Sequence, residues 1–136
     1  MAALELYRQL AERHGHYCPM STLGVRLGEE ALRQFASLPQ IDLELCYLAQ
    51  TCAIDGIRIV FETSNFNNDL RVERSGQHRL RCRSAGKELS LLLSEEAMQL
   101  AAGYRDLAEA EQPQRLELLR SLSAEHLITL LEGPID

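Results

Sequence analysis

The segment HGHYCP, at residues 14–19, places two of the chain's four histidines and one of its four cysteines within six positions. Imidazole and thiolate are side chains that bind zinc and related transition metals, and together they also form a nucleophile with its general base. On an extended segment His14, His16 and Cys18 all lie on one side, whereas on a helix only His14 and Cys18 share a face. The segment therefore indicates either a metal site or a cysteine nucleophile.

A second cysteine occupies a similar local position. Cys18 precedes a helix that we predict to begin at Pro19, and Cys52 is the first residue of a helix predicted over 52–62. A helix N-terminus has free N–H groups and a partial positive charge, so we expect both thiols to have a lowered pKa. Ligation through His16, Cys18 and Cys52 would leave one coordination position open, which is typical of a reactive or exchangeable site.

The pattern leaves other interpretations open. His14 can cap a helix end, His16 can lie in a turn and Cys18 can be a small buried hydrophobe. As a nucleophile, Cys18 would use His16 as its base and Asp55 to orient that base, although no segment supplies an oxyanion hole. A thiolate before proline can also ligate haem iron, so Cys18-Pro19 makes a haem site a further alternative.

The remaining histidines and cysteines carry weaker signals. Cys46 and Cys82 lie in the middle of predicted strands, where a free cysteine packs as a small hydrophobe. His78 and His126 are isolated in the sequence, and we expect both on the surface.

Five arginines are placed on two predicted strands: Arg79, Arg81 and Arg83 on one, and Arg71 and Arg74 on the other. We interpret them as a solvated face of the sheet. The functional alternative is an anionic partner, such as a phosphate-bearing cofactor or the acidic tail of a second subunit.

Composition indicates one globular domain. The 136 residues are 46% hydrophobic and 25% charged, and we find neither a membrane-length apolar segment nor a secretory signal, so we expect a cytoplasmic protein. Residues 94–136 hold nine acidic and three basic side chains, whereas residues 1–93 hold eleven of each. Because nucleic-acid binding needs a basic surface, we expect no nucleic-acid partner.

Periodicity predicts an α+β fold. Helical stripes cover residues 2–13, 19–37 and 52–62, and alternating apolar residues predict strands at 41–49, 69–73, 78–83 and 88–93, the last three as an antiparallel meander. Gly24 and Gly28 leave a bare strip for close backbone approach. Further helices are predicted at 95–109, from Pro113, and from a cap at Ser123 to Gly133.

The acidic tail carries leucines that we expect to pack against a second copy of the chain, because two short helices do not need them all. These leucines are Leu116, Leu119, Leu122, Leu127 and Leu130.

Two segments resemble signatures of a known family. HGHYCPMSTLGVRLGEEAL resembles the opening signature of the FmdE family of formylmethanofuran dehydrogenase proteins, His-Gly-His-x-Cys-Pro-Gly, and CAIDGIRI is similar to its second signature. The resemblance implies helices packed on a mixed four-stranded sheet in an α-β-α-β-β-β core, with an added N-terminal helix and a C-terminal helical tail. It implies a metal site, usually zinc, with His14, His16, Cys18, Cys52 and Asp55 at the matching positions, and often a homodimer.

The resemblance spans roughly residues 6–93, so we divide the chain into an FmdE-like domain at 1–93 and a helical extension at 94–136 within one compact unit. The chain departs from the family at Met20, where the signature has glycine, and at Thr63, where many members have cysteine. The site is therefore expected to have fewer sulfur ligands, a different metal, or a ligand supplied by a partner.

These observations predict a small protein that binds zinc or a similar divalent transition metal, accessory to a metal-dependent redox or one-carbon system. We expect a homodimer and a larger redox complex as partners, and no membrane. The alternatives are an enzyme that uses a metal-bound water or the Cys18 thiolate on a small substrate, and a haem-binding module through Cys18-Pro19. Whether the chain is an enzyme is left open at this point.

Overall fold

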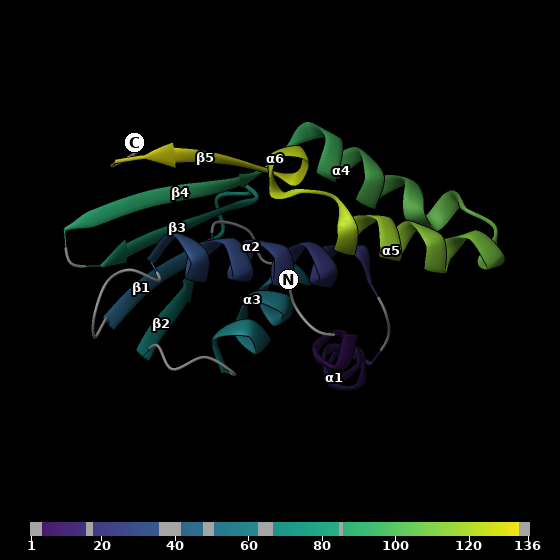
Figure 1. Cartoon of the computed structure of the whole chain (residues 1–136), viewed down its shortest axis with the longest axis horizontal. Helices are drawn as coiled ribbons and strands as arrows, with labels where there is room; N and C mark the ends of the chain where they lie inside the picture. Colours follow the sequence, from purple (N-terminus) through teal and green to yellow (C-terminus); the bar gives the residue numbers. More distant parts are fainter. Residues whose placement is uncertain are drawn as a thin grey trace.

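The computed structural model describes residues 4–15, 18–35, 42–47, 51–62, 67–84 and 86–133, without the side chains of residues 4, 14, 42–46 and 67–69. Helices pack on a mixed sheet, so the predicted α+β class is confirmed (Figure 1). The strands are β1 (Asp42–Tyr47), β2 (Asn67–Val72), β3 (Arg79–Ser84), β4 (Lys87–Leu93) and β5 (Ile128–Glu132), in the order β2-β1-β3-β4-β5.

The predicted meander is wrong at its first step. β2 pairs with β1, in parallel, and β3 lies on the other side of β1 in antiparallel orientation. The reason is the helix α3 (Ala53–Glu62), which connects β1 to β2 and carries the chain back to the end where β1 started. The β3–β4 hairpin is antiparallel as predicted, with Gly86 at a φ of 79° in its turn.

The C-terminus adds a strand where we predicted a helix. The helix after Ser123, α6 (Ala124–Leu127), is short, and Ile128 begins β5, which pairs with β4 in antiparallel orientation. The open edge of β4 offers unpaired N–H and C=O groups, and the β-branched Ile128 and Thr129 favour an extended backbone. The sheet of the described chain therefore has a fifth strand, from the tail.

Two helices form a layer on the sheet and a third lies outside them (Figure 1). Helix α2 (Pro19–Phe35) buries Leu27 and Phe35 in the same core cluster as Leu80 and Leu91 of the sheet. Helix α1 (Leu4–His14) packs Tyr7 and Leu10 against Val25, Ile59 and Val60, in a second cluster between α1, α2 and α3.

Glycines bring the backbones of α2 and α3 into contact. A Cβ atom on Gly24 would lie 2.7 Å from the carbonyl carbon of Ala53, and one on Gly56 would lie 2.6 Å from the amide nitrogen of Val25. Neither distance leaves room for a side chain, so the predicted close approach at Gly24 is confirmed. Because Gly24 and Ala53 lie near the starts of their helices, this contact holds both N-termini at one end of the layer.

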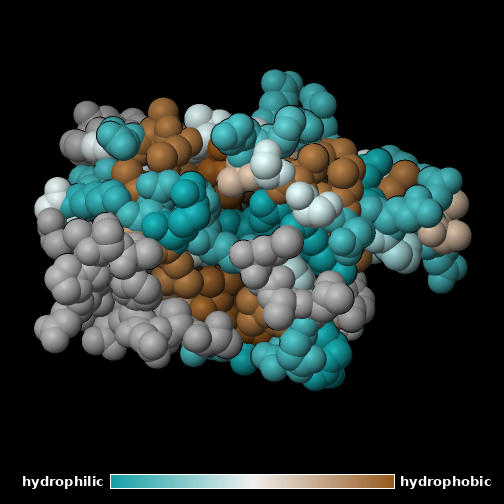
Figure 2. Space-filling model, viewed as in Figure 1, coloured by the Kyte–Doolittle hydropathy of each residue, from teal (hydrophilic) through white to brown (hydrophobic). Residues whose placement is uncertain are grey.

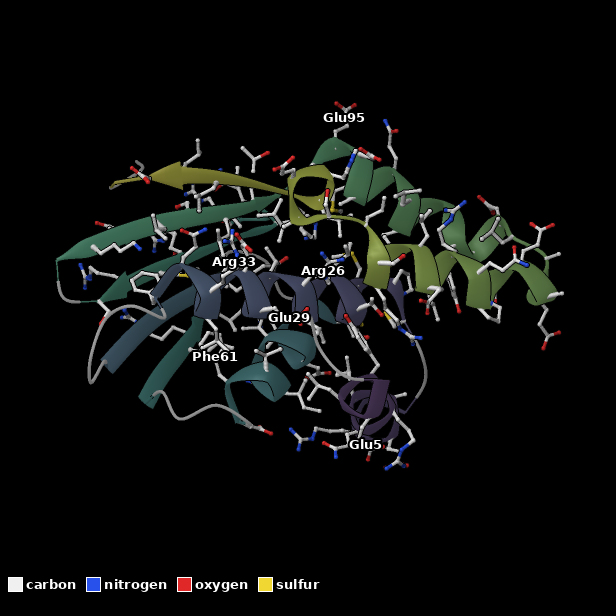
Figure 3. All side chains as sticks on the ribbon, viewed as in Figure 1. Glu5, Arg26, Glu29, Arg33, Phe61 and Glu95 are labelled. Atoms are coloured by element: carbon white, nitrogen blue, oxygen red, sulfur yellow. The ribbon has the colours of Figure 1, made fainter. Side chains whose placement is uncertain are left out.

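The tail packs onto this layer through α4 (Glu95–Ala102), two short 3-10 helices, η1 (Gly103–Asp106) and η2 (Glu109–Glu111), and α5 (Gln112–Ser121). The helix predicted over 95–109 thus ends at Ala102, whereas Pro113 lies in the first turn of α5 as predicted. Arg26 on α2 donates a hydrogen bond to the carbonyl oxygen of Leu119 at 2.8 Å and ties α5 to the core (Figure 3).

The tail leucines are used mainly within the chain. Leu116, Leu119 and Leu127 are buried, so the prediction that they offer surface to a second copy is wrong. Leu130 and its neighbour Leu131 on β5 are 38% and 39% exposed. Hydrophobic residues reach the surface in several places on the face drawn in Figure 2. None of the helices in the described ranges is long and apolar enough to cross a membrane.

Candidate functional site

A cleft of about 600 Å³ lies where the first residues of α2 and α3 meet the tail. Its walls come from the start of α2, the residue before α3, the residue before β3, helix α4 and the 3-10 helix η1. Cys18 and Cys52 both line it, and they are 34 residues apart in the sequence. The cleft therefore brings together the two thiols that helix-start positions predict.

The backbone at Cys18 is fixed by the first turn of α2. Its carbonyl oxygen accepts hydrogen bonds from the backbone N–H of Thr22 at 3.1 Å and from the hydroxyls of Ser21 and Thr22 at 3.0 Å. A residue whose carbonyl accepts the first helical bond while the residue itself stays outside the helix is the N-cap. Cys18 is thus held at the cap, as predicted.

Cys52 is placed by the start of α3. The hydroxyl of Thr51 accepts a hydrogen bond from the N–H of Ala53 at 3.2 Å, and the carbonyl of Cys52 accepts one from Asp55 at 3.1 Å. Thr51 therefore caps α3 as predicted, and Cys52 lies one residue before the helix rather than in its first position.

The two thiols interact directly, and the effect on Cys52 is opposite to our prediction. The pKa of Cys52 is raised to about 11, first by burial, then by the charge of the neighbouring Cys18 thiol and a side-chain hydrogen bond with it, and least by the charge of Asp55. Hydrogen bonding to the backbone lowers the pKa, but this is the weakest cause. The position at a helix start thus predicts only the small contribution that lowers the pKa of Cys52. Burial and the second sulfur, which both raise that pKa, are larger.

His78 is a site residue that the sequence interpretation missed. It was expected on the surface, but it lines the cleft, and its Nδ1 lies 3.3 Å from the hydroxyl of Tyr47. The β1–β3 ladder explains the contact, because Tyr47 pairs with Leu80, two residues after His78. Burial lowers the pKa of His78, so the imidazole is neutral at physiological pH.

The other two predicted ligands, His14 and His16, lie partly or wholly outside the described atoms. His14 is the last residue of α1, followed by Gly15 at a φ of 95°, and its side chain lies outside the described atoms, as does the whole of His16. Within the described ranges, His, Cys, Asp and Glu side chains do not converge in any group of three that could hold a metal ion. Cys18 and Cys52 are therefore the part of the predicted ligand set that the structure brings together.

Two of the weaker predictions hold and one lies outside the described atoms. Cys82 is fully buried in the core, and burial raises its pKa to about 12. His126 is exposed, with Nδ1 3.4 Å from a carboxylate oxygen of Glu96. Cys46 belongs to β1, and its side chain is outside the described part of the structure.

The arginine face is only partly solvated. Arg71, Arg74 and Arg83 are exposed, and Arg81 pairs with Glu73 at 3.3 Å. Arg79, in contrast, is only 9% exposed, and its Nε has no hydrogen-bond partner among the described atoms. The expectation of a solvated sheet face is thus wrong for Arg79, which sits beside the inner strand β4.

Two adjacent thiols in an open cleft can perform two kinds of chemistry. They can lose their protons and bind a zinc-like divalent cation as thiolates, which are ligands that such ions favour. They can also be oxidised to a disulfide. A tetrahedral zinc ion with bonds of about 2.3 Å holds two sulfurs roughly 3.8 Å apart, and the Cys18 and Cys52 thiols line the same cleft and interact through their side chains. The donor set therefore fits a zinc-like ion.

Comparisons with known proteins agree with the fold. A family model described as "FmdE, molybdenum formylmethanofuran dehydrogenase operon" matches residues 13–135. The crystal structure of a tungsten formylmethanofuran dehydrogenase FmdE-like protein from Syntrophus aciditrophicus superimposes with a TM-score of 0.69 at 14% identity, covering 97% of this chain and 72% of that one. At that identity the similarity shows the fold alone. No curated protein sequence matches the chain.

Proposed function

Because the chain belongs to the FmdE family, we propose that it is an accessory protein of a metal-dependent redox or one-carbon system, and that it binds a zinc-like divalent ion through Cys18 and Cys52. The observation that carries this proposal is the contact between the two thiols, one from the start of α2 and one from the start of α3.

The electrostatics of the pair support a cation between the sulfurs. Without a cation, the Cys18 thiol disfavours ionisation of Cys52, which is part of why the pKa of Cys52 is raised. A divalent ion reverses this, because coordinated thiols are deprotonated and the ion neutralises both charges. Binding should therefore release protons, and the apparent affinity should rise with pH until Cys52 ionises readily.

Histidine completes the proposed ligand set. His16 and His14 precede Cys18 by two and four residues, so either imidazole can reach an ion held by that thiol. His16 is our preferred ligand, because a three-ligand site with His16, Cys18 and Cys52 keeps one position for an exchangeable ligand.

The accessory role includes further proposals on assembly and location. Membership of a family described by a formylmethanofuran dehydrogenase operon supports work within a larger redox complex. A homodimer is proposed through the exposed leucines of the tail, which among the described residues are Leu118, Leu130 and Leu131. Free thiols at Cys18, Cys52 and Cys82 support a reducing, cytoplasmic compartment.

Metal content tests the proposal directly. The protein is purified without added metal, and zinc is measured by elemental analysis before and after incubation with zinc and removal of the excess. We expect about one ion per chain in the parent and in the control Cys82→Ala, and strong loss in Cys18→Ala and in Cys52→Ala. Cobalt loading should give thiolate charge-transfer absorption in the parent and not in either cleft variant.

Two results would contradict the proposal. One is zinc content that is the same in the parent, in Cys18→Ala and in Cys52→Ala, since the ion would then bind elsewhere. The other is parent protein that takes up no zinc at neutral pH although circular dichroism shows it folded.

A further inference from the structure

Among the described residues, the polar side chains that line the cleft beside the two thiols include no acidic one. Arg105 on η1 contributes a guanidinium, Tyr104 a hydroxyl and His78 an imidazole, while no carboxylate belongs to the lining formed by the described residues. Arg105 is exposed, and no acidic partner is placed against it among the described side chains. Except for the sulfurs, the polar side chains of the described lining thus include one cation and two groups that can donate a hydrogen bond.

A hydrogen-bond chain sets the direction in which His78 donates. Burial raises the pKa of Tyr47 to about 12, which keeps its hydroxyl protonated, and a hydrogen bond from the Thr51 side chain lowers that pKa by less. The hydroxyl of Thr51 accepts from the N–H of Ala53, so its own proton is free to bond the phenol oxygen of Tyr47. In the arrangement that these two bonds allow, the phenol proton is directed to His78 Nδ1, 3.3 Å away.

In this arrangement the imidazole of His78 carries its proton on Nε2. A neutral histidine has one donor and one acceptor nitrogen, and Tyr47 occupies the acceptor. Tyr47 is fully buried, whereas His78 is partly exposed and lines the cleft, so Nε2–H is the nitrogen left for a ligand. The arrangement holds a fixed donor ready before any ligand arrives.

We propose that the cleft binds a small organic anion with an apolar body, such as a monocarboxylate, whose oxygens accept hydrogen bonds from His78 Nε2 and whose charge is neutralised by Arg105. The apolar walls fit the body of such a molecule: Met20 from α2 and Met98 from α4 both line the cleft, and Ala101 and Ala102 add small side chains. A volume of about 600 Å³ is that of a small-molecule site.

Met20 is a wall residue of this cleft at which the chain departs from the FmdE signature. It stands where the FmdE signature has glycine, so the wall that it supplies is not required by the signature. Methionine is long and flexible, and it adapts to apolar ligands of varied shape. Met20 is therefore the specificity-determining residue for the apolar body.

This inference rests on the proposed function only in that the Cys18–Cys52 pair, with its ion, borders the same cleft. The anion contacts His78 and Arg105, which are not proposed metal ligands. Anion binding and zinc binding can therefore be measured separately on the same protein.

The test compares three probes with one apolar body: hexanoate, hexanol and hexylammonium. Dissociation constants are measured by calorimetry on metal-free and on zinc-loaded protein. We expect hexanoate to bind most tightly, His78→Leu to weaken it about tenfold, and His78→Gln, which keeps an N–H donor, to retain most of the affinity. Arg105→Gln should weaken hexanoate up to about fivefold, because an exposed ion pair is partly screened, and the exposed Arg74→Gln should have no effect.

Nuclear magnetic resonance of the His78 side-chain nitrogens gives a second readout that a merely structural role would not change. Hexanoate should shift Nε2, and Tyr47→Phe should abolish the preference for a proton on that nitrogen. Met20→Gly should weaken hexanoate and hexanol to the same degree, since it removes apolar contact and no charge.

The outcomes separate the two proposals. If the three probes bind equally, or hexanoate binds neither form of the protein, the anion site is overturned even if zinc is bound through the cysteines. If hexanoate binds with the expected variant pattern in protein that takes up no zinc, the anion site stands and the metal proposal fails.

Discussion

The contact between α2 and α3 at Gly24 makes a strong prediction about how the site is held. Substitution Gly24→Ala introduces a Cβ 2.7 Å from the carbonyl carbon of Ala53 and closer still to its oxygen. The oxygen contact is the more severe at 2.0 Å, and because carbon and oxygen pack at about 3.3 Å the backbones must separate by roughly 1.3 Å. The clash involves backbone on the α3 side, and no rotamer change can relieve it.

The size of the effect follows from two opposing contributions. Overpacking a close-packed contact costs about 1–3 kcal/mol, and a backbone clash belongs at the upper end. Alanine in a helix interior returns about 1 kcal/mol relative to glycine. We therefore expect the free energy of unfolding to fall by about 2 kcal/mol, which lowers the melting temperature of a domain of this size by about 6–8 °C.

Chemical and thermal unfolding followed by circular dichroism measures this loss. Two other glycines provide controls: Gly28→Ala meets the Val60 side chain at 2.9 Å, which should cost less, and Gly103→Ala meets only the end of the Arg115 side chain. Because Gly24 holds the helix starts together, zinc uptake should weaken in Gly24→Ala and not in Gly103→Ala. A Gly24→Ala variant that is about 1 kcal/mol more stable than the parent, as helix propensity alone predicts, would refute the close contact.

Three further predictions follow from burial and pKa. Iodoacetamide should alkylate Cys52 slowly at pH 7 and faster as the pH approaches 11, because burial and the Cys18 thiol raise the pKa of Cys52 and only the thiolate reacts. The substitution Cys18→Ser should speed the reaction at pH 9. Mass spectrometry measures both rates. Leu119→Ala should cost about 2–5 kcal/mol in urea unfolding, whereas Leu118→Ala, 38% exposed, should cost no more than about 0.5 kcal/mol; equal costs would contradict the packing of α5. Burial lowers the pKa of His78 from 6.5, so just below that pH the unfolded chain binds more protons than the folded chain. The stability contribution of neutral His78 is therefore present above pH 6.5, and it is lost as the pH falls through the lowered pKa of the folded state. His78→Gln should flatten this part of the curve of unfolding free energy against pH, and an unchanged curve would argue against burial of the ring.

The positions of the two cleft cysteines could be predicted because helix starts are local signals. Pro19 in a first turn and Thr51 as a cap depend only on neighbouring residues, and the structure confirms both. The spacing of Gly24 and Gly28 likewise indicated a close approach, although the partner helix could not be named from the spacing.

Features that depend on pairing between distant segments could not be read in the same way. The sequence of β2 is compatible with either neighbour, and only α3, crossing back over the sheet, places it beside β1 in parallel. The sequence pattern allows the last helix to continue through Ile128 and Thr129. In the structure these residues instead pair with the free edge of β4 and form β5. Local propensity is weaker than a full set of ladder hydrogen bonds.

The sequence by itself determined the class of fold and the helix starts at which Cys18 and Cys52 lie. Only the tertiary structure decided that the two thiols line one cleft, that burial and the neighbouring Cys18 thiol raise the pKa of Cys52, and that His78 joins the cleft through Tyr47. The physical reason is that periodicity and capping act within a few residues, whereas burial, charge and hydrogen bonding at a site depend on groups that the folded chain brings together from far apart.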